Sequence, residues 1–66
     1  MADNIPPRIE RLPAVLARTG LSRSSLYAAV KQSNFPAQVR LSSRAVGFLA
    51  HEVDAWIAGR AAQRSR

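Results

Sequence analysis

The sequence predicts a small, mainly α protein in which two short helices are followed by a two-stranded β hairpin and a third helix. Three observations predict this order. The tetrapeptide Thr19-Gly20-Leu21-Ser22 separates two helical patterns of apolar residues. The period then changes from helical to alternating after Phe35-Pro36, and a helical period returns near the C-terminus.

The first helix ends, and the second begins, within the tetrapeptide. Gly20 tolerates the left-handed conformation that ends many helices, and Ser22 can accept a hydrogen bond from the free N–H groups of the next helix. Pro13 suits the opening turn of the first helix, where N–H groups have no partner, and Val15 and Leu16 form its buried side. The segment is therefore predicted to be a helix-turn-helix.

The second helix has two chemically different faces. Leu26, Ala29 and Val30 recur at helical spacing and are expected to be buried, with Leu21 as a further anchor before the helix. The opposite, outward face consists of Arg23, Ser24, Tyr27, Ala28 and Lys31.

Two short strands and a covering helix complete the predicted domain. Val39 and Leu41, and then Val46 and Phe48, alternate with other residues on either side of Ser42-Ser43-Arg44. A lone hairpin is marginally stable, so its apolar face needs cover. The last helix offers an apolar stripe at helical spacing, made of Leu49, Val53, Trp56 and Ile57. The order helix, helix, hairpin, helix is a winged helix-turn-helix, and Trp56 is expected in its core rather than as a platform for stacking bases.

Length and composition place limits on the function. The 66 residues are enough for one domain, predicted at 11–60, between a flexible arm at 1–10 and a basic tail at 61–66. The chain has no cysteine for a disulfide framework or thiolate zinc site, and its one histidine, His51, has no partners at metal-ligand spacing. No apolar stretch could span a membrane and no secretory signal is evident, so a cytoplasmic protein is expected. Neither an enzyme nor a cofactor is predicted.

Charge points to nucleic acid as the partner. All four acids, Asp3, Glu10, Glu52 and Asp54, lie outside the segment from Arg11 to His51. That segment holds six basic residues, namely Arg11, Arg18, Arg23, Lys31, Arg40 and Arg44. The formal net charge of +6 is therefore concentrated on the helix-turn-helix and hairpin, as expected of a surface that meets phosphates. A charged surface that serves only solubility usually carries both acidic and basic residues.

Four spaced blocks between residues 11 and 60 also match a known family in order. They are R-L-P-x-V-L-A-R-T-G-L-S-R-S-S-L-Y, F-P, V-x-L-S-S-R-A-V-G-F and E-V-D-A-W-I. Together they resemble the AlpA-type prophage regulators, which are related in fold to phage excisionases and to the DNA-binding heads of MerR-type regulators. The resemblance implies a transcriptional regulator of a mobile element that promotes excision, with Ser22 to Gln32 as recognition helix and Val39 to Phe48 as wing. Ala50 departs from the family, which often has a better capping residue near this position.

Chemistry suggests which side chains contact DNA. A helix in the major groove presents its outer face, mostly near its N-terminus, to base edges. The candidates for base contact are therefore Arg23, Ser24, Tyr27 and Ala28. Arg23 can donate two hydrogen bonds to guanine or bind a phosphate. Tyr27 can donate its hydroxyl proton to a phosphate, and Ala28 can contact a thymine methyl group. The candidates for phosphate contact are Arg18, Ser22, Lys31, Arg40, Ser43 and Arg44, whereas Arg11 is expected to be a solvated surface charge.

Three functions are compatible with this pattern. The favoured one is a sequence-specific duplex-DNA-binding regulator whose wing lies on the backbone or in the minor groove. The alternatives are an architectural excision factor that bends DNA for a recombinase, and a protein or RNA adaptor. A single short recognition helix covers few base pairs, so further copies on neighbouring sites are expected partners, as are a recombinase or RNA polymerase.

Overall fold

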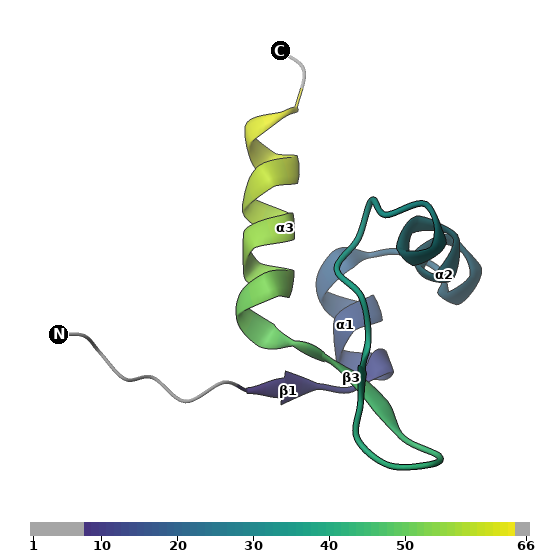
Figure 1. Cartoon of the computed structure of the whole chain (residues 1–66). Coiled ribbons are helices and arrows are strands. Elements are labelled where there is room, and N and C mark those ends of the chain that lie inside the picture. The colour runs from purple at the N-terminus through teal and green to yellow at the C-terminus, as the bar shows by residue number, and fades with distance from the viewer. Residues whose placement is uncertain (1–7, 65–66) are drawn as a thin grey trace, which may run out of the picture.

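The computed structural model describes residues 8–64 and shows three helices around a small antiparallel sheet (Figure 1). The elements in chain order are β1 (Ile9–Glu10), α1 (Leu12–Thr19), α2 (Arg23–Lys31), β2 (Val39–Arg40), β3 (Val46–Leu49) and α3 (Ala50–Ala62). This arrangement confirms the predicted mainly α, winged helix-turn-helix class. Its wing is the hairpin β2–β3 with the connecting turn.

The turn between α1 and α2 has the predicted chemistry. Gly20 ends α1 in the left-handed region, at φ 74°, and its N–H donates to the Leu16 carbonyl over 2.8 Å. Thr19 strengthens the corner, because its hydroxyl donates to the Val15 carbonyl and accepts from the Leu21 N–H. These bonds satisfy the backbone groups that a helix end leaves free and fix the angle at which α2 departs.

The sheet differs from the prediction by one strand. It has three strands in the order β1-β3-β2, all antiparallel, with Ile9 opposite Leu49 and Val39 opposite Gly47. Residues 9 and 10 were assigned to a flexible arm, but here they pair with the strand that precedes α3. Residues 1–7 of the predicted arm and the last two residues of the predicted tail lie outside the described residues.

Gly47 lies on the central strand β3, and its lack of a side chain lets β1 pack closely against that strand. A Cβ atom there would overlap the Ile9 side chain and lie 3.0 Å from the Glu10 carbonyl oxygen. Any larger residue would therefore push β1 away. Leu41 was expected within the hairpin strands but lies beyond β2, and its side chain is 42% exposed.

The start of α3 is stabilised by the chain that precedes α1. Leu49 was expected on the helical stripe, but it ends β3 and occupies the N-cap position of α3, where it makes no side-chain cap. The first helical N–H, that of Ala50, instead donates to the Arg8 carbonyl over 2.7 Å. A backbone group thus replaces the capping side chain that the sequence lacks at this point. The helix runs on to Ala62, into the segment predicted as a tail.

The core lies where α1, α2 and α3 meet the inner face of the sheet. Its buried side chains are Val15, Leu26, Phe35, Phe48, Ala50 and Val53. The rings of Phe35 and Phe48 meet edge to face, with centroids 5.6 Å apart. Other predicted core residues are only half-buried against this cluster, namely Leu16, Leu21, Ala29, Val30, Trp56 and Ile57.

Candidate nucleic-acid interface

The N-terminus of α2 is fixed by a local cap. The Ser22 hydroxyl accepts from the Ser25 N–H over 3.1 Å and donates to the Ser25 hydroxyl over 2.9 Å. Ser22 therefore acts as the N-cap that its sequence position predicts. Its single hydroxyl proton is already directed to Ser25, so a phosphate contact by Ser22 would have to replace that bond.

One face of α2 is exposed and polar. Leu26 is fully buried and holds the helix against the core, while Ala29 and Val30 are half-buried beside it. All five residues predicted for the opposite face are exposed, namely Arg23, Ser24, Tyr27, Ala28 and Lys31. Tyr27 is 38% exposed, which leaves part of its ring as a free surface. The helix thus presents a guanidinium, hydroxyls and a methyl group to the outside.

The wing turn is closed by its own backbone. The N–H groups of Leu41 and Ser42 both donate to the Ala45 carbonyl, over 2.8 and 3.1 Å, and the Ser42 hydroxyl accepts from the Arg44 N–H. These bonds place Ser43 and Arg44 at the tip, where both are exposed. Arg40 lies exposed on β2, opposite Val46. Three of the residues predicted to contact phosphates are therefore exposed on the wing, namely Arg40, Ser43 and Arg44.

Arg18 occupies a different environment from the other basic candidates. Its guanidinium donates to Asp54 Oδ1 over 2.7 Å and to Glu10 Oε1 over 2.9 Å, so it joins α1 to α3 and to β1. The hydrogen bonds that Arg18 donates to Asp54 and then to Glu10 raise the pKa of Arg18 above its ordinary value, so the side chain stays charged. Because two carboxylates already occupy its donors, we remove Arg18 from the predicted phosphate set. In the described structure Arg18 joins α1 to β1 and to α3.

This reassignment predicts the behaviour of an Arg18 variant. Arg18→Gln is expected to lower the melting temperature, because it leaves Glu10 and Asp54 without their cation. At temperatures where the variant is folded, its DNA affinity should depend on salt with the same slope as that of the wild type. Thermal melts by circular dichroism and binding titrations at several salt concentrations check both points. A wild-type melting temperature with a shallower salt slope would return Arg18 to the phosphate set.

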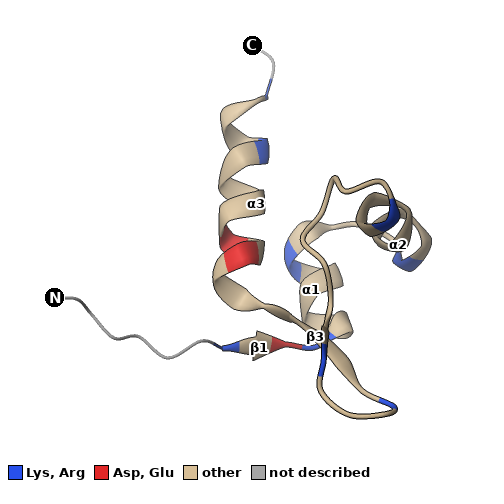
Figure 2. Ribbon diagram, viewed as in Figure 1, with Lys and Arg blue, Asp and Glu red and all other residues tan. Residues whose placement is uncertain are grey.

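The acidic side chains of the described residues lie outside α2 and the wing. Within residues 8–64, the carboxylates are those of Glu10 on β1 and of Glu52 and Asp54 on α3. Figure 2 shows these acidic positions on β1 and α3, whereas α2 and the wing carry basic positions alone. The exposed face of α2 and the wing are therefore both basic and free of acidic residues.

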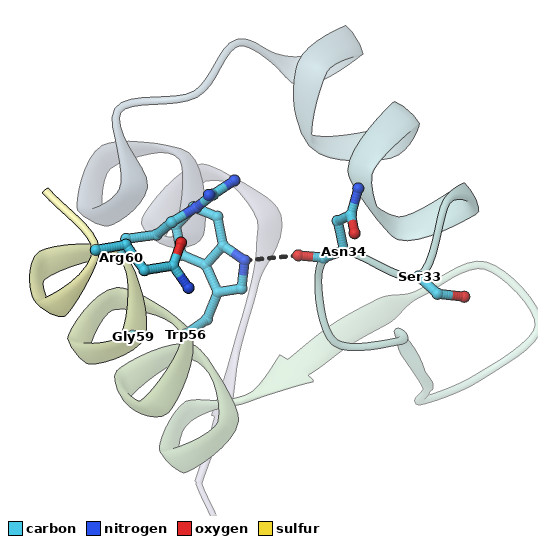
Figure 3. Close-up of a pocket in the computed structure, with 6 residues that line it drawn as sticks. Ser33, Asn34, Trp56, Gly59 and Arg60 are labelled. Atoms are coloured by element: carbon cyan, nitrogen blue, oxygen red, sulfur yellow. Dashed lines mark hydrogen bonds between the residues drawn. The ribbon is translucent and has the colours of Figure 1, made fainter. Parts of the chain in front are cut away.

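Trp56 sits at the edge of the core, beside a pocket that sequence reasoning did not find. Its indole N–H donates to the Asn34 carbonyl over 2.7 Å (Figure 3). The centres of the Trp56 and Phe35 rings are 4.9 Å apart, and the Arg60 guanidinium lies 5.0 Å from the centre of the Trp56 ring. The pocket has a volume of about 470 Å³ and is lined by Ser33, Asn34, Trp56, Gly59, Arg60 and Gln63. The expected core position of Trp56 is thus a half-buried one.

Comparison with known proteins places the chain in a family. The family described as "Prophage CP4-57 regulatory protein (AlpA)" matches residues 8–61, from the start of β1 through most of α3. The chain belongs to the AlpA family. This match confirms the resemblance drawn from the four sequence blocks, and it includes the strand β1 that those blocks did not reach.

Two relatives are similar to the chain over most of their length. The "DNA-binding transcriptional activator AlpA" of Escherichia coli (strain K12) is 34% identical over 59 residues, covering 80% of this chain and 84% of the relative. An "Uncharacterized protein ORF88" of Enterobacteria phage P4 is 42% identical over 66 residues, covering all of this chain and 75% of that protein. No solved structure matches the chain significantly. No helix in the described part of the chain is long and apolar enough to cross a membrane.

Proposed function

We propose that this AlpA-family protein is a sequence-specific duplex-DNA-binding transcriptional regulator of a prophage or related mobile element. The observation that carries the proposal is that the exposed face of α2 and the wing both carry basic residues and no acidic ones. A helix with an exposed polar face can enter a major groove, and a basic hairpin can contact the flanking backbone. The DNA-binding relative in Escherichia coli supports the same role.

Base contacts are assigned to the N-terminal half of α2. Arg23 is the first residue of the helix, and its planar guanidinium can donate two hydrogen bonds to guanine O6 and N7. Ser24 and Ala28 are exposed beside it and supply a hydroxyl and a methyl group, which suit a base edge and a thymine methyl. Tyr27 lies one turn after Arg23 and reaches a base or phosphate with its hydroxyl.

Phosphate contacts are assigned to the C-terminal end of α2 and to the wing. Lys31 closes α2, Arg40 lies on the strand β2, and Ser43 and Arg44 form the wing tip. Arg44 can enter a narrow minor groove, where the negative potential is strongest. Since α2 has only nine residues and reaches few base pairs, useful selectivity requires further copies on neighbouring sites. The protein acts by binding in the bacterial nucleoid and needs no cofactor.

The salt dependence of binding tests this proposal. With about 4 to 6 phosphates engaged, the logarithm of affinity should fall against the logarithm of salt concentration with a slope of about −3.5 to −5.5. Fluorescence anisotropy with a labelled duplex from the element's own promoter or attachment region gives this slope. Unlabelled duplex of unrelated sequence and duplex RNA serve as competitors, and both should compete poorly. A slope near zero, or RNA competing as well as the specific duplex, would refute duplex-DNA binding through phosphates.

A further inference from the structure

Arg11 is exposed, as expected, but its side chain is hydrogen-bonded to the wing. It occupies the N-cap position of α1, and its Nε donates to the carbonyl of Val46, 35 residues away on β3, over 3.1 Å. Val46 is also the residue opposite Arg40 across the β2–β3 pair. Since β1 and β2 flank β3, Arg11 and Arg40 approach the same strand position from opposite sides.

The two guanidinium groups have no acidic partner in the described structure. Every ion pair within residues 8–64 belongs to Arg18, and both Arg11 and Arg40 are exposed. The bond to Val46 uses only the Nε donor of Arg11, which leaves its two terminal amino groups available. Each guanidinium therefore remains available to an anion.

We infer that Arg11 is a DNA-phosphate-binding residue at the base of the wing, where it and Arg40 hold the backbone on either side of Val46. The inference rests on the proposed function. A planar guanidinium with free terminal amino groups matches the oxygens of a phosphate. The Val46 carbonyl restrains the long side chain before binding, so less rotamer freedom is lost when a phosphate is contacted.

Salt titrations of charge-matched variants test the inference. The probe is a labelled mixed-sequence duplex of about two helical turns, because a phosphate contact does not depend on sequence. Arg11→Gln is expected to weaken binding about fivefold at physiological salt and to make the salt slope shallower by about 0.9. The control is Arg8→Gln, which removes the same charge from an exposed residue whose described structural contact is made by its backbone carbonyl. It should keep the wild-type slope.

A second variant separates a binding role from a structural one. Arg11→Lys keeps the positive charge but loses the Nε that bonds to Val46, so it should keep the wild-type slope and bind about twofold to threefold more weakly. If Arg11→Gln fails to fold, Arg11→Lys still tests the inference, because wild-type affinity would show that a guanidinium held by the Val46 carbonyl is not what binds the phosphate. If Arg11→Gln and Arg8→Gln have equal salt slopes while the wild type has the expected slope, the inference about Arg11 is wrong but the proposed function stands. A wild-type slope near zero would overturn the proposed function as well.

Discussion

Trp56→Ala is expected to lower the free energy of unfolding by about 3 kcal/mol, the lower end of the range for large aromatic truncations, because the side chain is half-buried. The variant loses the edge contact with Phe35, the hydrogen bond to the Asn34 carbonyl and the surface on which Arg60 packs. A domain of this size has a total stability of only about 3 to 5 kcal/mol, so much of the variant should be unfolded at 25 °C. Urea denaturation followed by circular dichroism measures the difference.

Trp56→Phe is the matched control for this prediction. It keeps an aromatic ring against Phe35 but removes the indole N–H that bonds to Asn34, and it should cost about 1 kcal/mol. DNA binding should follow the folded fraction in both variants. If Trp56→Ala unfolds at the wild-type denaturant concentration and yet binds DNA poorly, Trp56 is a binding residue at the surface, and the core assignment is wrong.

The helix-turn-helix was predictable from sequence because its determinants are local. Gly20 needs only its own backbone freedom to end α1, and Ser22 caps a helix with a partner three residues away. The exposed face of α2 follows in the same way from the spacing of its apolar residues around Leu26. Those features of the candidate site that lie on one helix were therefore placed correctly by pattern alone.

Features that depend on distant parts of the chain were missed. The strand β1 has two residues and no period of its own, and it exists because Ile9 and Glu10 pair with β3 some forty residues later. The start of α3 was missed for the same reason. Leu49 was expected on the helix, but α3 begins at Ala50, whose N–H donates to the distant Arg8 carbonyl because no nearby side chain offers an acceptor. Local propensity contains no information on either contact.

The basic residues show this limit most clearly. Arg11 and Arg18 look alike in sequence, as arginines at either end of α1 with no acid in the helix. Folding brings Glu10 and Asp54 to Arg18 and the Val46 carbonyl to Arg11. One arginine thereby becomes a structural clamp, and the other keeps its terminal amino groups for a ligand. A charge count along the chain cannot distinguish them.

Arg23→Ala is expected to change the sequence preference of the protein, whereas Arg40→Ala is expected to weaken binding to every duplex alike. Arg23 lies exposed at the start of α2, where a helix in the major groove meets base edges, so its loss should cost about 1 to 3 kcal/mol on the preferred site. On unrelated duplexes the same variant should lose much less. Selection of bound sites from random DNA, followed by affinity measurements on the best and on an unrelated site, checks this.

Arg40→Ala separates the two roles because it removes one positive charge, as Arg23→Ala does, but from β2 rather than from the recognition helix. It should reduce affinity for specific and unrelated duplexes by the same factor and make the salt slope shallower by about 0.9, with no change in the selected sequence. Both residues are exposed and without a carboxylate partner in the described structure, so neither variant should unfold. If the two variants lose equal affinity and keep the wild-type preference, α2 does not discriminate between bases through Arg23, and specificity must come from the shape of the DNA that the wing and backbone contacts favour.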